Sequence, residues 1–410
     1  MFLSPEEKLL RLRKKYKITQ GELVGEDITR VFLGMIEIGK RSLTEKTAKL
    51  LCKNFHKIFE ERGITDRISL ADLMKTKEKQ AIEFLNEMLK SEINISNENL
   101  WIIEEALYEL EPKERSEFCE KLYIRFKNRE RYTLAREYLL KSFHGIRKIK
   151  NLKDKLQDMF FICENIGDFQ GAIYTYRKFL SWLPKEKLTP ENEKLKYSYA
   201  RALIEIKEYD EALEIINYLH KKTKNEDTLY IVRNLLARVY KEQNRIEDTI
   251  KEYSSLAKGK ESQEKVLAYC EIIKIGLELS DKDLIKKYYE KCKSIVSEFV
   301  ESTLETFDIF YILAKGAKEL GKIKETKAYY MEALVVGRVL KNLEKERVAI
   351  IGELFEVLDK SDFYSVQSIE VEYLELLKTT KDYQGALKIL DYYRKYLPNE
   401  LPQKFDLFLK

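Results

Sequence analysis

The 410-residue sequence predicts an all-α protein in which a small helical domain precedes a long array of helical hairpins. Helix breakers are scarce, because Pro and Gly contribute only 6 and 15 residues, about half their usual combined share. Leu, Lys, Glu, Ile and Tyr dominate, and most of these favour helices. A small residue followed four positions later by an aromatic or aliphatic one recurs along most of the chain. A chain of this length accommodates two or three domains.

The first helix begins at a clear N-terminal signal. Ser4 supplies a capping hydroxyl, and Pro5 stands at the first helical position, where its missing N–H costs nothing. Glu6 and Glu7 follow, and the helix dipole favours carboxylates there. Leu9 opens the apolar face, so we expect a helix that packs on a small core.

Two short helices with a tight turn between them are predicted next. Thr19 caps a helix over residues 20–24, and Thr29 caps a third helix over residues 30–37, which Gly39 ends. A short helix, a glycine-containing turn and a second short helix form a helix-turn-helix.

All of the net positive charge lies in this first part of the chain. Residues 1–65 contain 14 basic and 9 acidic side chains, whereas the other 345 residues contain 61 of each. A basic module on a neutral body indicates an anionic partner, with nucleic acid as the leading candidate. A membrane surface would instead require a large amphipathic face with anchoring aromatics.

The stretch LLRLRKKYKITQGELVGEDITRVFLGMIEIGKRSLT resembles the five-helix Cro/repressor (XRE-type) DNA-binding domain, over about residues 6–60. The resemblance implies that Arg13 and Glu37 brace the first helix against the third. It places the front of the recognition helix, and more weakly Met35, at base edges in the major groove. Phosphate contacts are implied at the second helix and after the third. The DNA-binding residues so implied are Gln20, Thr29, Arg30, Val31, Met35, Lys40 and Arg41.

The recognition helix departs from that family in one respect, because it is unusually apolar. Val31, Phe32 and Met35 stand where polar base readers are more common. Two interpretations stay open: contact with thymine methyl groups, or a helix that packs on protein and no longer binds DNA. For Lys40 and Arg41 the alternative is a solvated helix exit.

The remainder of the chain contains a repeat. The small position that opens the second helix of each hairpin falls at Ala135, Ala172, Ala212, Thr249, Ile285, Thr326 and Ala386. Ile285 is the one bulky exception. The residues four positions later are Leu139, Tyr176, Ile216, Tyr253, Tyr289, Tyr330 and Leu390, and a turn precedes each small position. We expect the aromatic stripes to form the repeat core.

This pattern resembles the tetratricopeptide repeat, a pair of helices whose copies stack into a right-handed superhelix. The clearest copy spans Lys153 to Glu186 and ends with the family's proline at Pro184. An irregular copy is expected around Arg347 to Val371, and a capping helix over Leu401 to Leu409. The predicted organisation is a helix-turn-helix domain (1–65), a helical linker (66–112) and a repeat domain (113–410).

In the repeat frame, the first helix of each pair lines the concave side, and a basic row runs along it. The fifth and ninth positions of the repeats provide cations, tyrosines and amides, which suit an extended peptide with acidic groups or a free carboxylate. Solvent-facing lysines and arginines are common on helices, so chance remains an alternative for this row. The residues are Gln157, Tyr197, Arg201, Asn234, Arg238, Lys274, Tyr311 and Lys315.

The domain order resembles the RRNPP family of peptide-sensing regulators (Rgg, PlcR, NprR and PrgX among them). That resemblance implies a cytoplasmic, homodimeric transcription factor that binds a double-stranded DNA operator and a short quorum-sensing peptide. The alternative is a scaffold whose helix-turn-helix no longer binds DNA. No enzyme motif is present. Five separated cysteines and three histidines show no metal-ligand spacing, so we expect no metal, no cofactor and buried thiols.

Overall fold

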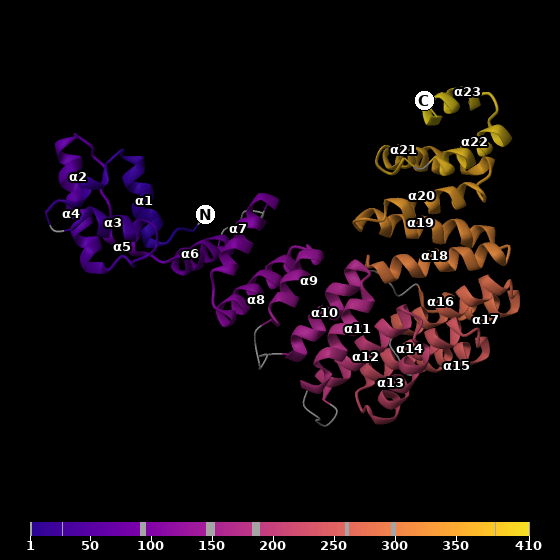
Figure 1. Ribbon diagram of the computed structural model, residues 1–410. Coiled ribbons are helices and arrows are strands. Elements are labelled where there is room, and N and C mark those ends of the chain that lie inside the picture. Colours follow the sequence, from indigo (N-terminus) through magenta and orange to yellow (C-terminus); the bar gives the residue numbers. More distant parts are fainter. Residues whose placement is uncertain are drawn as a thin grey trace. The chain divides into compact units, whose positions relative to one another are not determined.

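The computed structural model describes residues 2–26, 28–90, 96–144, 152–182, 189–258, 262–296, 301–381 and 383–409. Every regular element within these ranges is a helix, which confirms the predicted all-α class (Figure 1). The chain divides into two compact units, Met1–Lys185 and Glu186–Lys410. Each unit is described by itself.

The first unit opens with a five-helix domain, called the head below. Its helices are α1 (Pro5–Lys15), α2 (Gln20–Val24), α3 (Arg30–Glu37), α4 (Glu45–Glu61) and α5 (Leu70–Met74). The Ser4 hydroxyl accepts a hydrogen bond from the Glu7 N–H, and the Glu7 carboxylate accepts one from the Ser4 N–H. This reciprocal pair is the capping box that starts α1. The second and third helices have the predicted bounds.

The core of the head consists of leucine, isoleucine and phenylalanine side chains from all five helices. Leu9 of α1, Leu33 of α3 and Phe55 of α4 are completely buried in it. Ile68 and Leu73 complete the cluster from the segment that contains α5. The fifth helix therefore lies beyond residue 65, and the packed core of the head reaches Leu73.

The remainder of the first unit is helical as well. Its elements are α6 (Lys77–Lys90), α7 (Asn97–Tyr108), α8 (Pro112–Asn128), α9 (Tyr132–Lys141), α10 (Leu152–Ile166), α11 (Phe169–Phe179) and the 3-10 helix η1 (Leu180–Trp182). The linker predicted to be helical over residues 66–112 contains α5, which packs in the head, followed by α6 and α7. Pro184, which was expected to end the clearest repeat, lies outside the described residues.

The second unit continues the array. It contains α12 (Pro190–Glu205), α13 (Tyr209–Lys222), α14 (Glu226–Glu242), α15 (Ile246–Leu256), α16 (Ser262–Leu279), α17 (Lys282–Lys293), α18 (Leu304–Glu319), α19 (Ile323–Val339), α20 (Glu344–Phe355), η3 (Lys360–Asp362), α21 (Phe363–Thr380), α22 (Gln384–Tyr396) and α23 (Leu401–Leu409). Most of these helices pack in consecutive pairs. The irregular copy contains the additional helix α20, which contacts both α21 and α22.

The last described helix closes the array, as predicted. It spans the expected residues and packs on α22. Phe408 is buried, and its ring centroid lies 5.7 Å from that of Tyr373 on α21. In a repeat protein the end of the stack needs such a cover over its apolar face.

The repeat phase read from the sequence is confirmed by burial. All seven small positions, and all seven residues four positions later, are at most 7% exposed. The aromatic members of this set therefore belong to the core. Two of their hydroxyls donate hydrogen bonds to carboxylates: Tyr289 to Glu325 and Tyr330 to Glu353.

Every hairpin turn uses the same backbone device. The residue five positions before each small position has a positive φ between 53° and 74°. In the six turns whose next residue is described, its N–H donates to the carbonyl five residues back, as Asp168 does to Cys163 over 2.9 Å. These are the bonds of a Schellman motif, which satisfies the free carbonyls of a helix end. The left-handed residues are Glu130, Gly167, Lys207, Asn244, Ser280, Gly321 and Lys381.

The bulky exception, Ile285, has a structural explanation. A Cβ added to Gly276 of α16 would lie 2.7 Å from the Ile285 Cγ1 atom, and one added to Gly316 of α18 would lie 3.6 Å from its Cγ2 atom. Gly276 thus provides the room that a small residue at the hairpin position provides elsewhere, whereas a Cβ at Gly316 would make only an ordinary contact with Ile285. Ile285 is completely buried.

Candidate functional site

The front of α3 is the exposed part of the head's helix-turn-helix. Thr29 caps the helix, with its hydroxyl accepting from the Phe32 N–H over 3.2 Å, and Arg30 begins it on the surface. Val31 is 73% exposed. Phe32 packs against the head's core, whereas Val31 faces outward. The apolar residues of α3 therefore lie partly against the core and partly on the surface.

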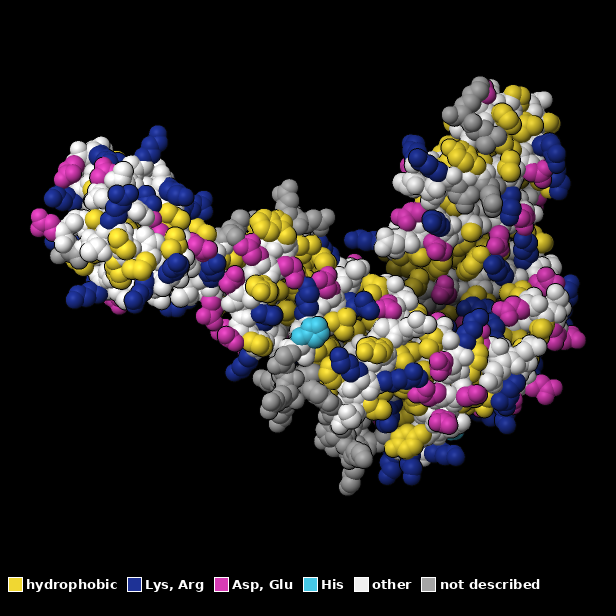
Figure 2. Space-filling view, in the orientation of Figure 1, with side chains coloured by type: hydrophobic (Ala, Val, Ile, Leu, Met, Phe, Trp, Pro, Cys, Tyr) yellow, Lys and Arg dark blue, Asp and Glu magenta, His cyan; other side chains and the backbone are white. Residues whose placement is uncertain are grey.

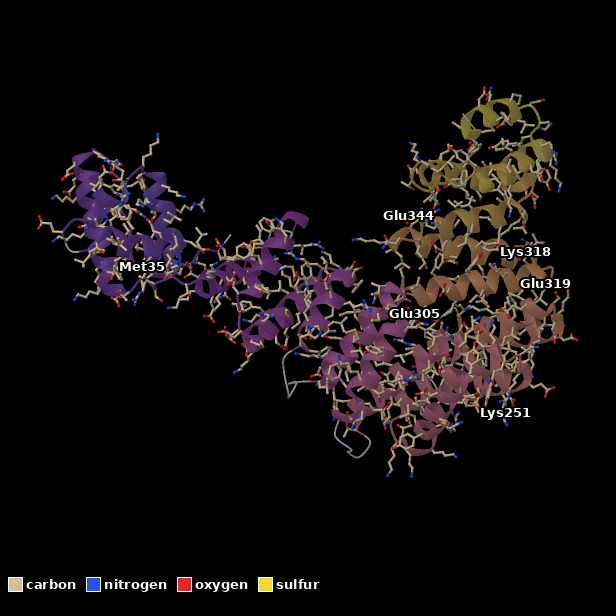
Figure 3. The ribbon with its side chains drawn as sticks, viewed as in Figure 1. Met35, Lys251, Glu305, Lys318, Glu319 and Glu344 are labelled. Atoms are coloured by element: carbon tan, nitrogen blue, oxygen red, sulfur yellow. The ribbon has the colours of Figure 1, made fainter. Side chains whose placement is uncertain are left out.

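Met35 lies one turn further along α3 and is half-buried (Figure 3). Its side chain is less exposed than those of Arg30 and Val31 at the front of the helix. Its backbone carbonyl accepts hydrogen bonds from the N–H groups of Lys40 and Arg41, over 2.9 and 3.2 Å. With Gly39 at φ 73°, these bonds turn the chain sharply after α3. Both cationic side chains stand exposed at that turn, as the sequence analysis expected.

A buried charge network holds α3 in place. The Arg13 guanidinium of α1 donates to both Glu37 oxygens, over 2.5 and 2.7 Å, and also to the Ile18 carbonyl. The Glu37 carboxylate is only 3% exposed. This confirms the expected bracing of the first helix against the third.

Gln20 joins the same network, which sequence reasoning did not foresee. Its Nε2 atom donates to the Glu37 carboxylate over 2.7 Å. Burial alone would raise the pKa of Glu37, but the hydrogen bonds from Arg13 and Gln20 outweigh it and hold that pKa below its ordinary value. The carboxylate therefore stays ionised, and Gln20 links α2 to α3 besides any contact it makes outside the protein.

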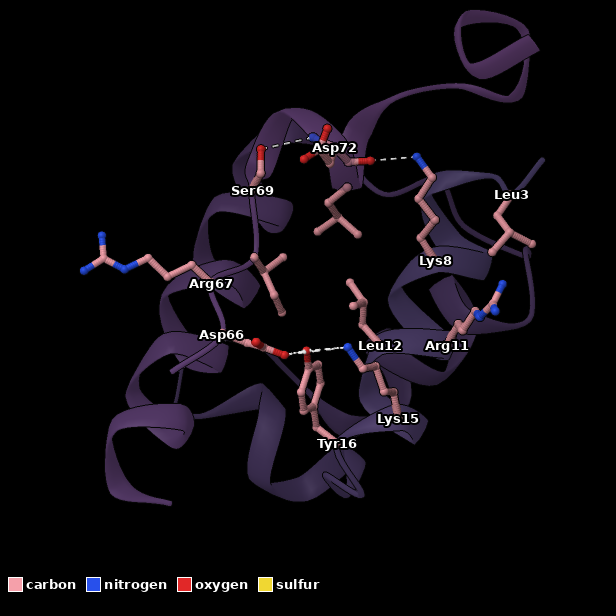
Figure 4. A pocket seen from close by; sticks show the side chains of 12 residues that line it. Leu3, Lys8, Arg11, Leu12, Lys15, Tyr16, Asp66, Arg67, Ser69 and Asp72 are labelled. Atoms are coloured by element: carbon pink, nitrogen blue, oxygen red, sulfur yellow. Dashed lines mark hydrogen bonds and ion pairs between the residues drawn. The ribbon is translucent and has the colours of Figure 1, made fainter. Parts of the chain in front are cut away.

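A second feature of the head is a cavity of about 440 Å³ between α1 and the segment that contains α5 (Figure 4). Lys8 donates across it to the Asp72 and Lys75 carbonyls, each over 2.6 Å. Tyr16 donates to Asp66, and Lys15 lies 3.6 Å from the same carboxylate. These contacts attach α5 to α1, so the polar groups of the cavity have a structural role.

The surface of the head is rich in cations, and lysine and arginine side chains project from much of its visible face (Figure 2). On α3 itself the only acidic residue is Glu37, which is buried. The exposed side of α3 therefore carries Arg30 without a carboxylate from the same helix to neutralise it.

In the second unit, the predicted basic row is paired with carboxylates. Arg238 lies 2.8 Å from Glu205, and Lys274 lies 2.5 Å from Glu271. Lys315 lies 3.6 Å from Glu353. Three of the four cations of the row are thus paired with carboxylates of the same chain.

The tyrosines of the row are half-buried. Burial raises the pKa of Tyr197, against the opposing effect of Arg201 nearby. The Tyr311 hydroxyl donates to the Glu353 carboxylate over 3.1 Å, while the Lys315 ammonium lies 4.3 Å from the centroid of its ring. Gln157 is on α10 in the first unit, whereas the other seven predicted residues belong to the second.

A cavity of about 420 Å³ is lined by two of the predicted residues, Asn234 and Arg238. It lies among α14, α15 and α16. Sequence reasoning missed its other polar lining, although Tyr230 stands one helical turn before Asn234 and could have been found by that spacing. The polar and aromatic residues that line it are Tyr230, Asn234, Arg238, Lys241, Glu242, Tyr253 and Glu271.

The cysteines are free and buried, as predicted. Burial raises the pKa of Cys119 to about 12 and that of Cys163 to about 11, so neither is a reactive thiolate at neutral pH. Within the described part of the chain, no three His, Cys, Asp or Glu side chains are grouped so as to hold a metal ion. None of the described helices has the length and apolarity to cross a bilayer.

No known family model matches the sequence, and a search of curated proteins finds no match. Two solved structures are similar over most of the chain. The apo form of the quorum sensor NprR from B. thuringiensis has 10% identity and a TM-score of 0.39, with 97% of this chain and 99% of that chain covered. The APC/C hetero-tetramer Cut9-Hcn1 has 13% identity and a TM-score of 0.39, with 99% and 80% covered. Both likenesses are too distant to support a function.

Proposed function

We propose that this protein is a cytoplasmic, homodimeric transcriptional regulator, in which the head binds duplex DNA and the repeat array binds a short signalling peptide. The observation that carries the DNA half is the exposed front of α3. There Arg30 stands with no exposed carboxylate on its helix, and Lys40 and Arg41 follow immediately. An arginine at the front of a recognition helix can donate two hydrogen bonds to a guanine edge. Cations beside a helix end suit phosphate oxygens.

The peptide half is supported by the cavity among α14, α15 and α16. Its volume of about 420 Å³ accommodates one or two peptide residues, not a whole peptide. Asn234 offers both a donor and an acceptor, which matches the backbone of an extended peptide. Tyr230 and Tyr253 add apolar surface beside it.

A regulator of this kind requires coupling between the two halves. The peptide must bind one conformation of the array more tightly than another, since a ligand with equal affinity for both states shifts nothing. Because the array is a stack of packed hairpins, a small change at each contact accumulates along it. In the proposed mechanism this change alters how the two heads of a dimer meet adjacent half-sites.

The proposed DNA binding is tested by a salt titration with the full chain and a random-sequence duplex. Fluorescence anisotropy measures the affinity at each salt concentration. We expect affinity to fall steeply with salt, because cations that contact phosphates release counterions. Arg30→Glu should lower the affinity about tenfold and flatten the salt dependence. The matched control is Arg67→Glu, which reverses an exposed arginine between α4 and α5.

The second candidate function, a scaffold that binds protein through α3, is favoured by two exposed apolar side chains. Val31 is 73% exposed and Ile38 is 65% exposed, and exposed aliphatic groups are typical of protein interfaces. A wild-type chain that does not bind duplex DNA even at low salt would favour the scaffold. Equal losses in the Arg30 and Arg67 variants would show that α3 is not the contact surface.

A further inference from the structure

The cavity of about 440 Å³ in the head, called the α1–α5 cavity below, belongs to neither the helix-turn-helix surface nor the peptide row. Its lining residues all lie in the described ranges 2–26 and 28–90, and none is on α2 or α3. Part of the lining is apolar: Leu12 comes from α1, and Ile68 and Leu73 come from the segment that contains α5. A cavity of this size with an apolar wall suits a small organic molecule.

Lys8 places a cation in this cavity without an ion-pair partner among the described residues. Its ammonium donates to the main-chain carbonyls of Asp72 and Lys75, each over 2.6 Å. An ammonium has three N–H groups, so one donor is left over. Burial lowers the pKa of Lys8, and the Lys75 charge lowers it further, whereas the Asp72 and Glu83 carboxylates raise it. A bound anion would therefore interact favourably with this half-buried charge.

Arg11 lies three residues after Lys8 on α1, so the two cations share one face of the helix. The Arg11 side chain is exposed, lines the cavity, and forms no hydrogen bond or ion pair with any residue that the structure describes. Both side chains extend from the α1 side of the cavity, opposite Ser69 and Arg67 (Figure 4). Helix α1 thus presents two cations with free donors to the same space.

The two carboxylates that line the cavity are engaged with other groups. Asp66 accepts a hydrogen bond from the Tyr16 hydroxyl and lies 3.6 Å from the Lys15 ammonium. Asp72 lies 3.6 Å from the Lys75 ammonium. Neither forms an ion pair with the two cations described above, so an anion from outside the chain can supply the missing counter-charge.

We propose that the α1–α5 cavity binds a small organic acid, whose carboxylate lies against Lys8 and Arg11 and whose apolar body lies against Leu12, Ile68 and Leu73. Hydrogen bonds from ammonium and guanidinium groups to a carboxylate are among the strong ones in proteins. The apolar wall removes the body of the ligand from water. This inference goes beyond the proposed function, since it requires neither duplex DNA nor a signalling peptide.

The test is isothermal calorimetry on the full chain at pH 7, with octanoate and 2-naphthoate as probes. We expect each acid to bind saturably at one site per chain. Acetate lacks the apolar body and should bind at least about a hundredfold more weakly. Octan-1-ol lacks the charge and should bind about tenfold more weakly than octanoate.

The variant Arg11→Gln removes one of the two cations and should lower the affinity for both acids about tenfold. Its matched control is Lys14→Gln, which removes an exposed cation of α1 outside the cavity and should match wild type. Lys8 is left intact because it also attaches α5 to α1.

Three results would overturn the inference. Neither acid binds the wild type saturably, octan-1-ol binds as tightly as octanoate, or the Arg11 and Lys14 variants have equal affinities for the acids. The proposed function is judged separately, because its assays measure binding of duplex DNA and peptide and contain no organic acid.

Discussion

At the scale of single residues, Glu37 links the stability of the head to the position of α3. The carboxylate is buried and receives hydrogen bonds from α1 and α2, so both helices fix the orientation of α3 through one group. A charge buried in this way stabilises a fold only while both partners are present. The same contact that positions the surface of α3 therefore makes the head sensitive to acid.

We predict that Glu37→Gln destabilises the head by about 2 kcal/mol at pH 7, because the Arg13 guanidinium loses its counter-charge. The pKa of Glu37 is lowered in the folded state. Its contribution is thus complete above the unfolded value, about 4.3, and is lost as the pH falls through the folded value. Hydrogen exchange of the α1 and α3 amides, at pH 7 and at pH 3, measures both effects.

In that experiment the wild type and the Gln variant should converge toward pH 3. The control is Glu45→Gln, which removes an exposed carboxylate paired with Lys49 on the surface of α4. Exposed pairs of this kind contribute little to stability. A constant difference between wild type and Glu37→Gln across the pH range would contradict the role assigned to the ionised carboxylate.

At the scale of helices, one hairpin has the large residue Ile285 at the position that is small in the others. It keeps its geometry because the facing residue, Gly276, is small. The close approach of α16 and α17 depends on Gly276, where the hydrogen that stands in place of a Cβ faces the Ile285 side chain. Packing of this density leaves no room for an added methyl group on the crowded side.

We predict that Gly276→Ala destabilises the second unit by roughly 1–3 kcal/mol, because its new Cβ would overlap Ile285. Ile285→Ala alone should also be costly, since it leaves a cavity. Combined, the two substitutions should cost less than the sum of the single effects. Urea unfolding of wild type, the two single variants and the double variant gives a double-mutant cycle for this pair. Gly316→Ala is the control, because its Cβ would make only ordinary contacts and a helix favours Ala over Gly.

Much of the element structure could be predicted from the sequence, and the reason is local. Caps such as Thr19 and Thr29 act within three residues, so the bounds of α2 and α3 follow from nearby positions. The partners of the basic row could not be predicted in the same way. Arg238 pairs with Glu205, 33 residues away, and Lys315 with Glu353, 38 residues away. Such pairs depend on how neighbouring helices align, which no local pattern specifies.

At the scale of the whole molecule, the proposed function requires that a ligand in the second unit influence a surface in the first. Most of the polar residues predicted for the peptide lie on the first helices of successive hairpins, from α12 to α18. An extended ligand would therefore contact several repeats at once, and its binding energy would be divided among their contacts.

We predict that short peptides selected on the full chain from a display library of seven-residue sequences bind through the cavity among α14, α15 and α16. Asn234→Ala should weaken them about tenfold, because a backbone amide loses a donor and an acceptor together. Isothermal calorimetry measures the change. Lys251→Gln is the control, since Lys251 is exposed on α15 and outside the cavity.

The coupling itself is measured by adding a selected peptide to the duplex-binding assay. Linkage requires that duplex DNA change the affinity for peptide by the same factor as peptide changes the affinity for DNA. Peptides that bind but leave duplex affinity unchanged would separate the two activities and argue against a regulator. If Asn234→Ala leaves the affinity for a selected peptide unchanged, that peptide binds elsewhere on the array.

The turns of the array are specified by a torsion angle and by main-chain hydrogen bonds, not by side-chain identity. Glutamate, lysine, asparagine, serine and glycine all occupy the left-handed position in different hairpins. The rim of the array can therefore change its charge and shape from one variant to the next with little penalty to folding. Side chains at these turn positions can therefore differ between related proteins while the backbone of the array keeps the same course.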